Sequence, residues 1–78
     1  MEKQICETID CLVEAIYHLE MKRLDNTFVQ LLDELEEYIM QKPSGIWEEL
    51  LLHMQDSYIR KDYVRFADIL LYKLKTVL

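Results

Sequence analysis

Apolar residues recur along the chain at the three- and four-residue spacing of helices that bury one face. The apolar positions of the first segment are Ile5, Ile9, Leu12, Val13, Ile16 and Leu19. They predict a helix over about residues 3–22. Lys22 and Arg23 would then lie at its C-terminal end, where cations interact favourably with the helix dipole.

The segment RLDNTF, residues 23–28, is expected to separate the first helix from the second. Asp25 is suited to cap the next helix, and Leu24 is placed to pack against Val29 as a hydrophobic staple. The second predicted helix spans about residues 26–41. Its buried face would consist of Phe28, Leu31, Leu32, Leu35 and Ile39.

The segment QKPSG, residues 41–45, contains the only proline and the only glycine and predicts a loop. Ser44 is a candidate N-cap for a third helix over about residues 45–60. Asp62 is the natural cap of a fourth, over about residues 62–77. The predicted inward positions are Trp47, Leu50, Leu51, Met54 and Tyr58 on the third helix, and Tyr63, Phe66, Leu70, Leu74 and Val77 on the fourth.

Four helices in 78 residues predict an all-α fold, with two antiparallel helical hairpins forming a four-helix bundle. The length allows one domain, residues 1–78. The halves align when the chain is shifted by 38 residues, so that Phe28 falls on Phe66. This similarity is either a true duplication or the agreement of any two amphipathic hairpins of equal length, and both predict the same architecture.

The last two helices carry more apolar residues than one buried face requires. Leu52 lies off the stripe of the third helix, and Ile69, Leu71 and Tyr72 lie off that of the fourth. Five tyrosines are also more than a thin core can bury, and tyrosine is enriched at interfaces. We therefore predict an interaction surface made of Leu52, Tyr58, Ile69, Leu71 and Tyr72.

The net charge of −6 is unevenly distributed, with −7 over residues 1–40 and +1 over residues 41–78. An acidic protein gains nothing from counterion release on nucleic acid, so DNA or RNA binding is not expected. No apolar stretch approaches the roughly 20 residues of a membrane span, and Glu7 and Asp10 interrupt any signal peptide. A cytoplasmic location without membrane contact is the expectation.

The residue pattern does not predict an enzyme. His18 and His53 have no histidine or cysteine three or four residues away, so no metal site and no cofactor are expected. Cys6 and Cys11 would diverge by about 140° on a helix, too far for a disulfide. Both are expected to be buried or half-buried thiols. The acidic run Asp33, Glu34, Glu36 and Glu37 has the spacing of a solvated helix face.

The segment KDYVRFADILLYKL resembles the final helix of small, uncharacterised helical proteins of Gram-positive bacteria. The residues that carry the resemblance are Lys61, Asp62, Tyr63, Ala67, Asp68, Leu70 and Tyr72. The opening ETIDCLVEAIYHL, residues 7–19, is similar to the start of such proteins. The resemblance implies a bacterial, cytoplasmic helical domain and no activity. The expected fold is also similar to that of small flagellar and secretion chaperones.

Three hypotheses of function follow. The first is a non-enzymatic interaction domain, adaptor or chaperone-like, that forms a homodimer or docks a partner helix through its third and fourth helices. The second is an acidic regulator or antitoxin-like inhibitor that docks a basic partner through Glu34, Glu36 and Glu37 of the second helix. The third is a small enzyme, which would require a clustered polar pocket.

Overall fold

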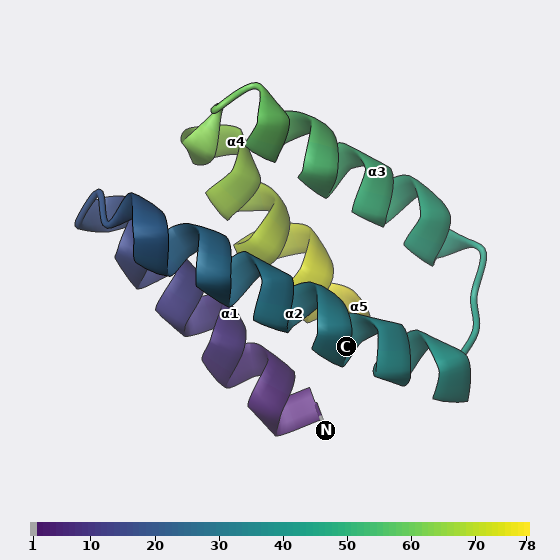
Figure 1. Ribbon diagram of the computed structural model, residues 1–78. Coiled ribbons are helices and arrows are strands. Elements are labelled where there is room, and N and C mark those ends of the chain that lie inside the picture. The colour runs from purple at the N-terminus through teal and green to yellow at the C-terminus, as the bar shows by residue number, and fades with distance from the viewer. Residues whose placement is uncertain (1) are drawn as a thin grey trace. The chain divides into compact units, whose positions relative to one another are not determined.

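A computed structural model describes residues 2–78, which are all-α and contain no strand. The elements are α1 (Glu2–Tyr17), α2 (Met21–Gln41), α3 (Ile46–Ile59), α4 (Tyr63–Asp68), η1 (Ile69–Leu74) and α5 (Lys75–Val77). They form two compact units, which divide between Lys42 and Pro43. The predicted all-α class and the two helical hairpins are confirmed (Figure 1).

The first hairpin consists of α1 and α2, which pack against each other along their length (Figure 1). The predicted stripes supply most of its buried residues, which are Ile5, Ile9, Leu12, Val13, Phe28, Leu31 and Leu35, and Thr8, Ala15, Leu24 and Tyr38 complete them. The open end is tied by Glu2, whose Oε1 accepts a 3.1 Å hydrogen bond from the Tyr38 hydroxyl. The same oxygen accepts a 3.2 Å bond from Lys42 Nζ, so the start of α1 is held to the end of α2.

The turn of this hairpin lies at residues 18–20, earlier than the sequence predicts. Leu19 has a φ of 56°, in the left-handed region. Its amide donates to the carbonyl of Ile16 (3.2 Å), and the amide of Glu20 donates to that of Ala15 (3.1 Å). These two bonds are the Schellman motif, which normally has glycine at the left-handed position. Leu19 is 71% exposed, so its predicted place in the buried stripe is wrong.

The predicted boundaries 22 and 26 are therefore wrong by five residues each. Lys22 and Arg23 lie in the first turn of α2 and not at the end of α1, and Asp25 lies within α2 and does not cap it. Leu24 is fully buried and Val29 is 59% exposed, so they form no staple. Asp25 is a good capping residue by type, but the helix begins four residues before it, at Met21.

The loop after α2 leads into α3 at Ile46. Gly45 occupies the N-cap position, so the predicted cap at Ser44 is displaced by one residue. The Ser44 hydroxyl still accepts from the amide of Ile46, at a long 3.5 Å. Its carbonyl accepts from the amide of Trp47 at 3.3 Å. The loop itself lies where the sequence predicts it.

The second hairpin repeats the turn of the first. Lys61 has a φ of 59°; its amide donates to the carbonyl of Tyr58, and that of Asp62 donates to Ser57. This is a second Schellman motif, again without glycine. The Asp62 carboxylate accepts from the amide of Arg65 at 3.3 Å, so the predicted cap of the fourth helix is confirmed.

The fourth helix contains a π-helical segment, η1, that the sequence does not predict. The amide of Lys75 donates to the carbonyl of Leu70, five residues back. A π turn accommodates about one residue more than an α turn. The buried residues of the helix are Phe66, Ile69, Leu70 and Leu74. In a regular α-helix Leu74, eight residues after Phe66, would lie about 80° from it, and the wider turn returns Leu74 to the buried face.

The positions of the two turns also test the predicted similarity between the two halves of the chain. Lys61 lies 42 residues after Leu19, and the two residues occupy the same position of the same motif. A shift of 38 residues therefore does not superimpose the turns. It differs from 42 by four residues, about one helical turn, and so keeps the apolar positions approximately in phase.

Candidate interaction surface

The outer face of α3 presents two large apolar side chains to solvent. Leu52 is 64% exposed and Ile59 is 77% exposed. They are seven residues apart, close to two helical turns, so they project from the same side of the helix. The buried residues of α3, Trp47, Leu50, Met54 and Ser57, occupy the opposite side. α3 therefore has a second apolar face besides the one that packs in the hairpin.

Charged residues border this face at both ends of the helix. Glu48 and Glu49 lie in the first turn of α3, at its acidic end. At the other end Arg60 follows the last helical residue, and its Nε lies 3.1 Å from Asp56 Oδ1. Lys61 comes next, in the turn. The face is thus acidic at its start, whereas at its end the positive charges of Arg60 and Lys61 are accompanied by Asp56 and Asp62.

Leu52 is one of five residues predicted to form the interaction surface, and Tyr58 is the second. The ring of Tyr58 makes edge-on contacts with Phe66 (centroids 5.2 Å apart) and Tyr63 (6.1 Å). It lies between α3 and α4 and is half-buried. Tyr58 is therefore mainly a packing residue of the second hairpin, with one edge open to solvent.

The other three predicted residues lie in η1 and have different environments. Tyr72 is 72% exposed and Leu71 is half-buried, but Ile69 is only 3% exposed. The expectation that Ile69 lies outside the buried face is wrong. Ile69 and Leu70 follow Phe66 by three and four residues, the spacing of one α-helical face, so both lie on the buried side. The five predicted residues therefore do not lie together on one exposed surface.

The two most exposed apolar residues of the second hairpin were missed by the sequence reasoning. Ile59 and Val64 are each 77% exposed, on either side of the second turn. The spacing of Ile59 from Leu52 would have identified it as part of the same face. Val64 lies outside the predicted stripe, at the second residue of α4, and a single valine there carries no such signal.

The acidic run of α2 is largely exposed. Asp33, Glu36 and Glu37 face solvent, and no ion pair links them to any residue in the described part of the chain. Glu34 differs from the expectation because it is half-buried. Its Oε2 accepts from Gln30 at 3.3 Å, and its buried Oε1 has no hydrogen-bond partner among residues 2–78.

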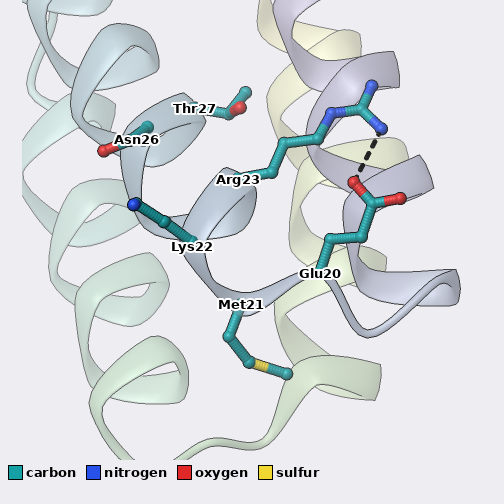
Figure 2. A pocket seen from close by; sticks show the side chains of 6 residues that line it. All are labelled: Glu20, Met21, Lys22, Arg23, Asn26 and Thr27. Carbon is teal, nitrogen blue, oxygen red and sulfur yellow. Dashed lines mark hydrogen bonds and ion pairs between the residues drawn. The ribbon is translucent and has the colours of Figure 1, made fainter.

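A shallow pocket lies beside the first turn and is lined by Glu20, Met21, Lys22, Arg23, Asn26 and Thr27 (Figure 2). Arg23 Nη1 lies 3.2 Å from Glu20 Oε2, and this hydrogen bond is the main reason that the pKa of Arg23 is raised. Arg23 also borders a polar groove between α1 and α2 that contains Cys11. Cys11 is exposed, against expectation, whereas Cys6 is half-buried as predicted.

Electrostatics at the open end of the first hairpin follow from its hydrogen bonds. The pKa of Glu2 lies below its ordinary value, chiefly because Lys42 donates a hydrogen bond to the carboxylate, and also because Tyr38 does. The pKa of Lys42 is raised by the same bond to Glu2. The Lys42 ammonium also lies 5.4 Å from the centre of the Tyr38 ring, in a cation–π arrangement.

Among residues 2–78, no three or more His, Cys, Asp or Glu side chains form a group that could hold a metal ion. None of the helices in that range is long and apolar enough to cross a membrane. Comparison with protein-family models, with curated proteins and with solved structures finds no match to the chain.

Proposed function

We propose that the chain is a small, non-enzymatic protein–protein interaction domain, adaptor or chaperone-like, whose second hairpin docks an α-helix of another protein molecule. The observation that supports this proposal is the pair Leu52 and Ile59 on the outer face of α3. Two apolar side chains seven residues apart match the i, i+7 spacing of apolar residues on an amphipathic partner helix. Charged residues border the pair, as polar residues border the apolar centre of many interfaces.

The last helix adds apolar area to the proposed surface. Tyr72 and Val64 are exposed there, and Tyr58 and Leu71 would contribute their exposed edges. Full burial of one such side chain contributes about 1.5–3 kcal/mol. Association costs at least about 4 kcal/mol before any surplus appears as affinity. A few partly buried side chains leave a small surplus, so we expect a weak and reversible contact.

The test is affinity capture from an extract of the source cells, with the purified chain as bait. Wild-type chain should retain one or more proteins, and the double variant Leu52→Glu/Ile59→Glu should lose them. Val29→Glu is the matched control, because Val29 is also exposed (59%) but lies on α2. Retention should persist at about 1 M NaCl, where the Debye length is roughly 3 Å.

Two results would count against the proposal. One is the absence of any specifically retained protein and of any self-association. The other is equal loss of binding in Val29→Glu and in the double variant, since this would exclude a specific role of the α3 face.

A second candidate function is that of an acidic regulator that docks a basic partner on α2. It is favoured by Asp33, Glu36 and Glu37, which are exposed and have no ion pair with any other residue described. Salt separates the candidates, because binding through these carboxylates would be lost at about 1 M NaCl. The triple variant Asp33→Asn/Glu36→Gln/Glu37→Gln should then lose the partner, and Leu52→Glu should keep it.

A further inference from the structure

We draw no further inference here: the strongest candidate, the polar groove between α1 and α2 that is lined by Cys11 and Arg23, rests on one exposed cysteine, and nothing else among residues 2–78 points to a ligand there.

Discussion

Leu19 and Lys61 are the two non-glycine residues with positive φ in the described structure. The left-handed conformation costs an L-residue roughly 1–2 kcal/mol, because Cβ approaches the following carbonyl oxygen. Both residues are exposed, so their side chains gain little packing in return. The cost is offset by the Schellman hydrogen bonds, which satisfy carbonyl groups at the ends of α1 and α3.

Replacement of Leu19 by glycine is expected to stabilise the fold. Glycine adopts the left-handed conformation without the steric penalty, so Leu19→Gly should raise the free energy of unfolding by about 1 kcal/mol. Urea denaturation measures the change. Leu52→Gly is the control: Leu52 is similarly exposed but lies inside α3, where glycine should cost about 1 kcal/mol. Equal destabilisation by both would show that the Leu19 side chain makes stabilising contacts.

Glu2 is expected to make the stability of the fold depend on pH in the acidic range. Its pKa is lowered in the folded state, so the charged carboxylate contributes stability above the unfolded pKa. That contribution is lost as the pH falls through the folded pKa, which lies below the ordinary value for glutamate. The melting temperature of wild type should exceed that of Glu2→Gln at about pH 6, and the difference should shrink as the pH is lowered below the ordinary glutamate pKa of about 4.3. A difference independent of pH would assign the effect to packing.

The π-helical segment η1 shows how a whole element can adjust to its sequence. Phe66, Ile69, Leu70 and Leu74 are buried at positions i, i+3, i+4 and i+8, one residue longer than the α-helical pattern i, i+3, i+4, i+7. The π turn takes up the additional residue. It also leaves Lys73 exposed, whereas a regular helix would turn that lysine toward the buried face.

Deletion of Tyr72 should therefore be tolerated. It shortens the distance from Phe66 to Leu74 to seven residues, so a regular α-helix can bury the same side chains. Deletion of Gln55, an exposed residue of the regular helix α3, would instead move Tyr58 into the buried position of Ser57. We expect the Tyr72 deletion to lower the free energy of unfolding, measured by urea denaturation, by at least about 2 kcal/mol less than the Gln55 deletion does. An equal loss of free energy of unfolding in the two deletion variants would contradict the explanation that η1 accommodates one additional residue.

The elements that the sequence predicts correctly are those with a strong local signal. Most of the apolar stripes, the Pro–Gly loop and the Asp62 cap have such a signal and were confirmed. The first turn was misplaced because Leu19 continues the apolar spacing of α1 and no glycine marks the left-handed residue. Of the candidate surface, Leu52 and Tyr72 are exposed as expected. Ile69 was misassigned because the predicted stripe lay between Phe66 and Leu74, whereas the buried face also includes the position three residues after Phe66.

At the scale of the whole molecule, the two units differ in charge. The unit that ends at Lys42 carries −6, and the unit from Pro43 to Leu78 is neutral. A high net charge of one sign keeps a surface from associating with its own copy. The acidic unit thus favours solubility and the neutral unit favours contact.

The prediction of a single domain can be tested through Trp47, the only tryptophan, which lies in the second unit. Trp47 fluorescence reports on that unit, while far-UV circular dichroism reports on the helices of both. A single cooperative domain requires that the two urea transitions coincide. Separate midpoints would show that the hairpins unfold independently and would contradict the single-domain prediction.

The three-residue turns have a consequence for how the chain folds. Each connects two helices directly, so the packing inside a hairpin joins residues that are close in sequence, at most the 40 residues between Glu2 and Lys42. Chains with such local contacts fold in microseconds to milliseconds. During synthesis, the first hairpin has all its internal partners once Lys42 leaves the ribosome. It can therefore begin to pack before the second hairpin has emerged.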